Sequence, residues 1–276
     1  MRLAISYCKY KTRRKHYLFI EFANGCRLGN QMFFVAAGET LRKRYDLDVL
    51  YYTPVKRDFL KIDDWIFRKV DIIIHRCNFF HIIKEKDILS NIDEIKNILM
   101  NSHIVARGTF EDLNFIDREL ARQLFAISPK IRKSIINMYG DLSDYVCVHV
   151  RRGDFVKLGI SLPIDYYEMA MSYWDDNQKF IVVSDDIAWC EQNFKSNDRI
   201  VFAKKERSVY HDLFIPTLCQ KGNIISCSTF TWWGAFLNEN PNAVSIMPYP
   251  WWNYRTDKKL YLDNSIKIDI HNMRFI

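Results

Sequence analysis

The second half of this chain alternates short β-branched runs with stretches of helical length, and no other sequence feature constrains the fold as strongly. The apolar runs cover residues 145–150, 179–184, 200–203, 223–227 and 243–247. The helix-length stretches cover residues 163–174, 187–194, 208–220 and 229–238. Strands without polar alternation, separated by helices, are typical of βαβ units on a parallel sheet. Residues 141–276 are therefore predicted to form a Rossmann-like lobe, in which ligands bind beyond the carboxyl ends of the strands.

The first half is predicted to form a second α/β lobe, over residues 1–140. An apolar run at 16–23 is followed by a turn and by a helix over 30–45, with a strand expected at 48–52. Within the helix, four apolar residues recur at spacings of three and four, which places them on one face: Phe34, Ala37, Leu41 and Tyr45. A chain of 276 residues is long enough for two lobes that each bury a core.

Composition and charge narrow the classes of partner. The chain is 49% hydrophobic and 26% charged, which is typical of a folded globular protein. Its net charge of +7 favours an anionic partner: a phosphorylated small molecule, a nucleic acid or an anionic membrane surface. A nucleic-acid binder should gather basic and aromatic residues on one surface, whereas Lys and Arg are spread along this sequence. We therefore expect no nucleic-acid partner.

The cysteines and acidic residues do not form a recognisable metal motif. The seven cysteines include no C-x-x-C pair and sit mostly in apolar runs, as expected of reduced, buried thiols in a cytoplasmic protein: Cys8, Cys26, Cys77, Cys147, Cys190, Cys219 and Cys227. The cluster His75, Cys77 and His81 lacks a second ligand pair at a suitable spacing. The adjacent pairs at 175–176 and 185–186 point to opposite faces of an extended chain, so they are poor chelators. We expect no metal site and no cofactor.

The N-terminal segment also bears on location. Residues 1–15 are basic in their second half and lack the apolar run and cleavage site of a signal peptide. No stretch reaches the length of a transmembrane helix. We expect a cytoplasmic protein, for which a peripheral contact with the cytoplasmic membrane surface stays open.

The first candidate site motif is H-V-R-R-G-D, which covers His149 to Asp154. Side chains two apart share a face of a strand, so His149 and Arg151 should project together, with Arg152 on the opposite face. Arg151 then lies at the carboxyl edge of the strand, where a guanidinium group can make two-pronged hydrogen bonds to a diphosphate. The alternative explanation is a solvated arginine pair, in which one member forms a salt bridge with Asp154.

The second candidate motif is S-C-S-T-F-T-W-W-G-A, over residues 226–235. It predicts a strand, a hydroxyl-rich turn and a helix capped by Ser228 or Thr229. The unpaired N–H groups and the dipole at such a helix start form a ready anion site. Capping without a ligand is the alternative explanation.

The third motif, G-C-R-L-G-N-Q-M at residues 25–32, is a glycine-bearing turn that opens a helix. Glycine lets the backbone approach a ligand closely. The motif is neither G-x-G-x-x-G nor a P-loop, so taken alone it favours a plain loop before a helix.

In this order, L-G-N-Q-M, H-V-R-R-G-D and S-x-F-x-W-W-G-A resemble the bacterial α-1,2-fucosyltransferases of glycosyltransferase family 11. The resemblance extends over residues 17–250. It implies two Rossmann-like α/β lobes of GT-B type, with an acceptor-side N-terminal lobe and a donor-binding C-terminal lobe. It also implies GDP-fucose as a substrate, a galactose-containing oligosaccharide as acceptor at its 2-hydroxyl, inversion at the anomeric carbon, and no metal.

The resemblance assigns roles to individual residues. Arg151 resembles the arginine that binds the donor diphosphate, and His149 the histidine near the guanosine. The segment of Ser228, Thr229 and Phe230 resembles the one that contacts the β-phosphate. Asp212 resembles an acidic residue that reads guanine, a role that suits a carboxylate because guanine's N1–H and 2-amino groups are adjacent donors.

On the acceptor side, Gly29 and Asn30 match the cleft-facing turn of the first lobe. Asp154 and Asp165 are candidates for a general base, and a structural role is the favoured alternative for Asp154.

Three departures from the family pattern and two alternative functions accompany the resemblance. Cys26 and Arg27 stand where the family has a pair of glycines, and Pro216 should kink the helix that follows Asp212. A transferase for another sugar, or for a protein acceptor, would keep the same phosphate-binding residues. A non-catalytic nucleic-acid binder is the remote alternative.

Overall fold

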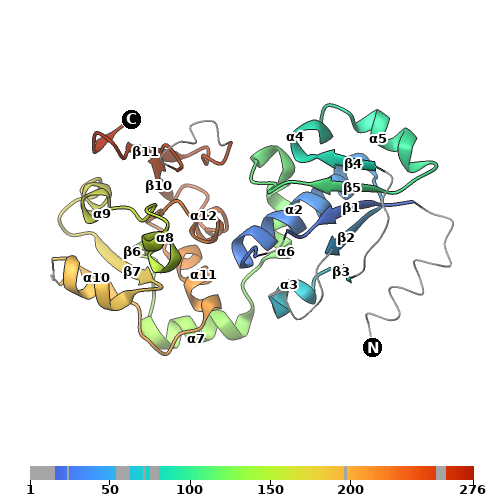
Figure 1. Cartoon of the computed structure of the whole chain (residues 1–276). Helices are drawn as coiled ribbons and strands as arrows, with labels where there is room; N and C mark the ends of the chain where they lie inside the picture. Colours follow the sequence, from blue (N-terminus) through green and yellow to red (C-terminus); the bar gives the residue numbers. More distant parts are fainter. Residues whose placement is uncertain are drawn as a thin grey trace. The chain divides into compact units, whose positions relative to one another are not determined.

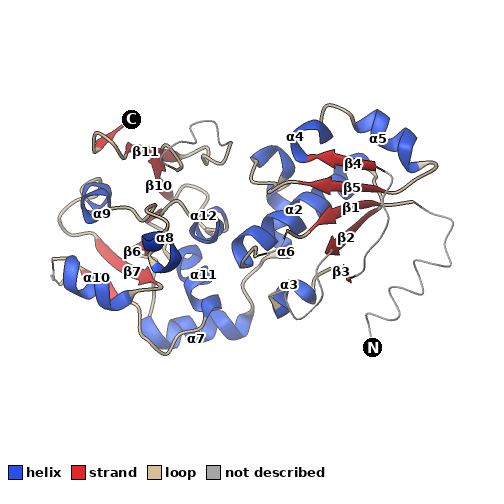
Figure 2. Ribbon diagram, in the orientation of Figure 1, coloured by secondary structure: helices blue, strands red, loops and turns tan. Residues whose placement is uncertain are grey.

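The computed structural model describes residues 16–23, 25–53, 63–70, 72–74, 81–195, 198–252 and 259–276. The chain divides into two compact units, Met1–Leu124 and Phe125–Ile276 (Figure 1). Each unit is an α/β layer structure around its own sheet (Figure 2).

The first unit contains a parallel sheet in the order β3-β2-β1-β5-β4. Its strands are β1 (Leu18–Glu21), β2 (Val49–Thr53), β3 (Ile72–Ile74), β4 (His81–Lys84) and β5 (Ile104–Arg107). Its helices are α2 (Leu28–Tyr45), α3 (Asp64–Phe67), α4 (Glu85–Ile88), α5 (Ile92–Leu99), the 3-10 turn η2 (Leu113–Phe115) and α6 (Arg118–Leu124).

The long helix α2 packs tightly in the first unit. Of the apolar face expected from its spacing, Phe34, Ala37 and Leu41 are fully buried. The Tyr51 ring of β2 reaches across to α2, where its hydroxyl donates to the Val35 carbonyl at 3.1 Å. Gly38 permits this approach, because a Cβ there would overlap the ring. The helix starts two residues earlier than predicted and ends at Tyr45 as predicted.

The second unit contains a seven-stranded sheet in the order β12-β11-β10-β9-β6-β7-β8, parallel except for the β11–β12 pair. Its strands are β6 (Tyr145–Val150), β7 (Lys179–Ser184), β8 (Ile200–Phe202), β9 (Gly222–Ile224), β10 (Val244–Tyr249), β11 (Ser265–Asp269) and β12 (Arg274–Phe275). Its helices are α7 (Pro129–Tyr139), α8 (Gly153–Lys157), α9 (Ile164–Met171), α10 (Ile187–Asn193), α11 (Val209–Leu218) and α12 (Thr229–Phe236).

Aromatic rings pack helix α12 into the core of the second unit. Trp232 and Trp233 are fully buried. The Trp232 ring stacks on Phe236 with centroids 4.8 Å apart, and its indole N–H donates to the Leu260 carbonyl at 2.6 Å. These contacts fix α12 in the core of the unit. Its first residues follow strand β9, at the carboxyl ends of the strands, where ligands bind in an open α/β sheet.

The unit boundary lies before α7, whereas the sequence placed it at residue 140, after this helix. Helix α7 belongs with the second unit because its polar side chains contact residues from that unit. Ser134 Oγ lies 2.9 Å from His211 Nε2, and Arg132 pairs with Glu239. The apolar pattern of the sequence does not indicate which lobe α7 joins, because the contacts that decide this are made with residues far along the chain.

Several predicted segments of the second unit end at other residues than the sequence predicts. Strand β9 stops at Ile224, because the chain then turns toward α12, and β10 continues to Tyr249. Helix α11 runs to Leu218 with Pro216 inside it, and the Asn238 side chain donates to the Pro216 carbonyl at 2.9 Å. Helix α9 stops at Met171.

Among the described residues, no helix is both long and apolar enough to cross a bilayer.

Candidate functional site

The strand order of the second unit reverses between β6 and β9. Strands β7 and β8 extend the sheet on one side of β6, while β9, β10 and β11 extend it on the other. In an open α/β sheet, the crevice for a ligand lies outside the carboxyl ends of the strands at such a switch point. Strand β6 leads into Arg151, and β9 leads into the turn before α12. Two of the three sequence motifs therefore meet at one edge of one sheet.

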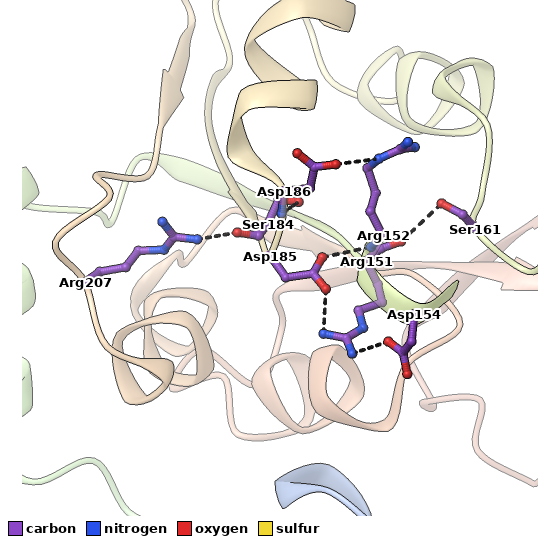
Figure 3. A network of polar contacts seen from close by, with 8 residues as sticks. All are labelled: Arg151, Arg152, Asp154, Ser161, Ser184, Asp185, Asp186 and Arg207. Atoms are coloured by element: carbon purple, nitrogen blue, oxygen red, sulfur yellow. Dashed lines mark hydrogen bonds and ion pairs between the residues drawn. The ribbon is translucent and has the colours of Figure 1, made fainter. Parts of the chain in front are cut away.

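Two arginines and two aspartates lie at the ends of neighbouring strands. The last residues of β6 and β7 are partners in the ladder, so the arginine pair after β6 faces the aspartate pair after β7. Arg151 Nη1 lies 2.8 Å from Asp185 Oδ2, and Arg152 Nε lies 3.3 Å from Asp186 Oδ2. The Arg152 backbone N–H donates to Asp185 Oδ1 at 2.8 Å. Figure 3 shows the two guanidinium groups diverging toward different aspartates.

Arg151 contacts two carboxylates, Asp154 and Asp185. Its Nη2 donates to Asp154 Oδ1 at 2.6 Å, so the salt bridge considered from the sequence is present. Its guanidinium carbon lies 5.4 Å from the centroid of the Phe155 ring. Its Nε is buried and has no hydrogen-bond partner among the described residues. Arg151 thus brings a fixed positive charge to the switch point, with carboxylates on two sides.

Arg152 is held differently. Its guanidinium carbon lies 3.7 Å from the centroid of the Trp189 ring, on helix α10. The carboxylate that it contacts, Asp186, also caps that helix, because Oδ1 accepts from the Trp189 N–H at 3.2 Å. These contacts fasten Arg152 to α10, away from the switch point.

His149 joins strand β6 to the start of α12. The imidazole is 5% exposed and meets the Phe230 ring edge to face, with centroids 5.6 Å apart. Burial, together with the nearby charges of Arg151 and Arg207, lowers the pKa of His149 to about 3. Neither ring nitrogen has a hydrogen-bond partner within the described part of the chain. A neutral imidazole at this place offers one donor and one acceptor.

The start of α12 has the form expected of an anion site. The helix begins at Thr229 with Ser228 as its N-cap, and the Ser228 side chain makes no capping hydrogen bond. The Ser228 backbone N–H donates to the Ser226 carbonyl at 2.7 Å, which fixes the turn. Trp252 donates from Nε1 to the Cys227 carbonyl at 3.0 Å. The first N–H groups of a helix have no partner within it, so this end favours a negatively charged group.

Asp212 lies in the first turn of α11 and is engaged by an arginine that the sequence reasoning missed. Arg207 Nε donates to Asp212 Oδ1, and the same guanidinium group donates to the carbonyls of Ser184 and Lys204. Burial raises the pKa of Asp212 to about 6, and Arg207 opposes this shift. Asp212 is thus placed by Arg207, which also ties α11 to the end of β7.

The other predicted residues lie elsewhere. Asp165 is exposed in the first turn of α9, on a different element from the arginine network. Gly29 and Asn30 lie in the first turn of α2, in the first unit. There Asn30 Nδ2 donates to Glu111 Oε1 at 3.0 Å, and Gln31 Nε2 donates to the Cys26 carbonyl at 2.8 Å. Helix α2 thus follows β1 with an organised first turn.

Cys147, Cys190, Cys219 and Cys227 are buried free thiols, and Cys26 is half-buried. Burial raises the pKa of Cys190 to about 11. Cys8, His75 and Cys77 lie outside the described residues. Within those that the structure describes, no three His, Cys, Asp or Glu side chains gather as metal ligands.

Three residues of the polar network at this edge of the sheet are not among the predicted site residues: Arg207, Asp185 and Asp186. For the aspartates a signal was available, since both follow a predicted strand directly, as the arginines do. Arg207 lies in a loop, and nothing in the local pattern marks it.

Comparison with known proteins gives one family. The model of glycosyl transferase family 11 matches residues 110–268. The O-antigen biosynthesis glycosyltransferase WbnK of Escherichia coli is 32% identical over 58% of this chain and 59% of its own length. An alpha-1,2-colitosyltransferase of E. coli is 34% identical over 38% of this chain and 40% of its own. The galactoside 2-alpha-L-fucosyltransferase SEC1 of Bos taurus is 35% identical over 34% of this chain and 29% of its own length. The chain therefore spans less than two thirds of each of these relatives.

Solved structures resemble the fold. The Bradyrhizobium fucosyltransferase NodZ, in its Se-Met crystal structure, gives a TM-score of 0.53 at 14% identity, over 95% of this chain and 98% of that chain. The NodZ alpha-1,6-fucosyltransferase soaked with GDP-fucose gives a TM-score of 0.50 at 15% identity, over 95% of this chain and 99% of that chain. The predicted fold class is confirmed: two Rossmann-like α/β lobes of the GT-B type.

Proposed function

Because this chain belongs to glycosyltransferase family 11, we propose that it transfers L-fucose from GDP-fucose to the 2-hydroxyl of a terminal galactose on a glycan, with inversion at the anomeric carbon. The observation that carries the proposal is that Arg151 and the start of α12 follow the neighbouring strands β6 and β9 at the switch point. The contact between His149 and Phe230 joins the two elements. One fixed cation and one helix start suit a diphosphate, and the names of two relatives supply the sugar and linkage.

In the proposed reaction, the acceptor oxygen attacks the anomeric carbon while the bond to the β-phosphate oxygen breaks. Negative charge develops on the leaving diphosphate. Arg151 and the N–H groups at the start of α12 stabilise that charge from positions fixed before the reaction. His149 stays uncharged beside them, so it adds a hydrogen-bonding edge near the nucleotide without a second positive charge.

Asp154 is the proposed acid–base residue. Its carboxylate contacts Arg151 in this structure. It becomes available to the acceptor hydroxyl only when the diphosphate has taken its place on the guanidinium group. Because an oxocarbenium-like transition state needs little deprotonation of the acceptor until late, the demand on this base is small.

A second candidate activity is transfer of another 6-deoxy sugar from its GDP donor. The name of one relative, a colitosyltransferase, favours this alternative. The phosphate-binding residues would be the same, and the difference would lie in contacts to the sugar ring.

The test is nucleotide release from a panel of GDP- and UDP-sugars, with and without lipid-linked and free oligosaccharides that end in galactose. The proposal expects GDP release from GDP-fucose that depends on the galactose acceptor, and a product whose new linkage is α-1,2 by NMR. Turnover of GDP-colitose in preference to GDP-fucose would select the second candidate. Turnover of UDP-sugars alone would refute both.

A further inference from the structure

The Asp185 carboxylate contacts the turn that carries Arg151 through both of its oxygens. Its Oδ2 lies 2.8 Å from Arg151 Nη1, and its Oδ1 accepts the Arg152 backbone N–H at 2.8 Å. One carboxylate therefore fixes both the side chain of Arg151 and the peptide that follows it. Asp185 itself is the residue after strand β7, so its backbone is set by the sheet (Figure 3).

The other carboxylate on Arg151 is held less firmly. Asp154 contacts Nη2, the opposite edge of the guanidinium group, at 2.6 Å. It lies on the five-residue helix α8, and its side chain is 38% exposed against 29% for Asp185. The two edges of Arg151 therefore differ: one faces a carboxylate anchored on the sheet, and the other faces one on a short surface helix.

Gly153 makes room for this arrangement. A Cβ at this residue would fall well inside contact distance of Asp185 Oδ2, and the backbone has a positive φ of 21°. A side chain here would push the Asp185 carboxylate off the turn. The glycine of H-V-R-R-G-D is thus explained by Asp185, which lies thirty-two residues further along the chain.

We propose that Asp185 is a positioning residue for Arg151: it holds the Nη1 edge so that the Nη2 edge, which now faces Asp154, is presented to the diphosphate. The inference rests on the proposed function. Asp154 leaves the guanidinium group when the diphosphate arrives, while Asp185 stays. Guanidinium groups bind carboxylate and phosphate in the same planar geometry, so the exchange requires no rearrangement of Arg151.

The test is a double-mutant cycle on GDP binding. Asp185→Asn should weaken binding of GDP about tenfold, within the range for coupled neighbours. In an Arg151→Ala background the same change should have no further effect, because Asp185 acts through Arg151. Binding of guanosine, followed by ligand-observed NMR, should be unchanged within about twofold, since guanosine has no phosphate.

Two further variants keep the test interpretable. Asp186→Asn is the matched control: it makes the same chemical change one residue later, keeps a good N-cap for α10 and should bind GDP like the wild type. Gly153→Ala should reproduce the GDP-specific loss of Asp185→Asn even if that variant folds poorly.

The outcomes separate the two proposals. A wild-type protein that does not bind GDP refutes the proposed function. If the wild type binds GDP, an undiminished affinity in Asp185→Asn, an equal loss in the Arg151→Ala background, or an equal loss for guanosine would each overturn the role of Asp185.

Discussion

Replacement of Arg151 is the most direct test of the site. Arg151→Ala removes a charge that the structure fixes between Asp154 and Asp185 at 2.6 and 2.8 Å. Loss of one preorganised donor to a developing charge lowers turnover by about a hundredfold or more, which corresponds to about 2.7 kcal/mol or more of transition-state stabilisation. We expect kcat for fucosyl transfer to fall by at least this factor.

The fold should survive the replacement. The two carboxylates that lose their partner are partly exposed and can be hydrated, so the cost in unfolding free energy is about 1 kcal/mol or less. Thermal unfolding followed by circular dichroism provides this control. A variant that unfolds before the assay temperature would have to be compared at a lower one.

The lysine variants test the geometry. Arg151→Lys should restore little turnover, because one ammonium group cannot reproduce the two-edged contact of a guanidinium group. Arg152→Lys should be milder, because Arg152 stacks on Trp189 and pairs with Asp186 on the other side of the strand end. Near-normal kcat in Arg151→Lys, or a larger loss in Arg152→Lys, would refute the reasoning.

Three other predictions follow from the same site. Activity should persist in EDTA, because Asp185 and Asp186 are each paired with an arginine; complete loss that manganese restores would contradict this. Asp212→Ala should raise KM for the GDP-sugar and narrow the preference over ADP- and UDP-sugars, because a pair of hydrogen bonds to guanine is lost; an unchanged preference would move that role elsewhere. Folding stability should fall as pH drops below about 6.5, because His149 is protonated when unfolded and, with its pKa lowered to about 3, stays neutral when folded. Between pH 6.5 and 5, the free energy of unfolding measured in urea should fall by about 2 kcal/mol less in His149→Gln than in the wild type. Equal falls in the two proteins would show that His149 is not the group responsible.

The architecture of the second unit was predictable, because its strands are buried on both faces and so appear as continuous apolar runs. Strands β6 and β7 match their predicted bounds. The predicted boundary at residue 140 differs from the observed one, which follows Leu124. Helix α7 joins the second unit through side-chain contacts with residues far along the chain. Contacts of that kind leave no periodic trace in the sequence.

The site was predictable where one motif supplies both the element and the side chain. His149, Arg151 and the start of α12 are brought together at the switch point by their own strands. Arg207 was not predictable, because it is defined by contacts with two other segments, Ser184 at the end of β7 and Asp212 on α11. For Asp212, the sequence identified the residue but not the arginine that places it.

The adjacent aspartates show how one periodicity rule has two consequences. Because neighbouring side chains on an extended chain point to opposite faces, we expect that Asp185 and Asp186 do not share a metal ion. The same rule applies to Arg151 and Arg152, which follow the adjacent strand at the same level. Across the strand ends each arginine side chain pairs with a different one of the two aspartates, Arg151 with Asp185 and Arg152 with Asp186. The aspartates are poor chelators because their side chains diverge. For the same reason, Asp186 can fasten Arg152 to α10 while Asp185 orients Arg151 at the switch point.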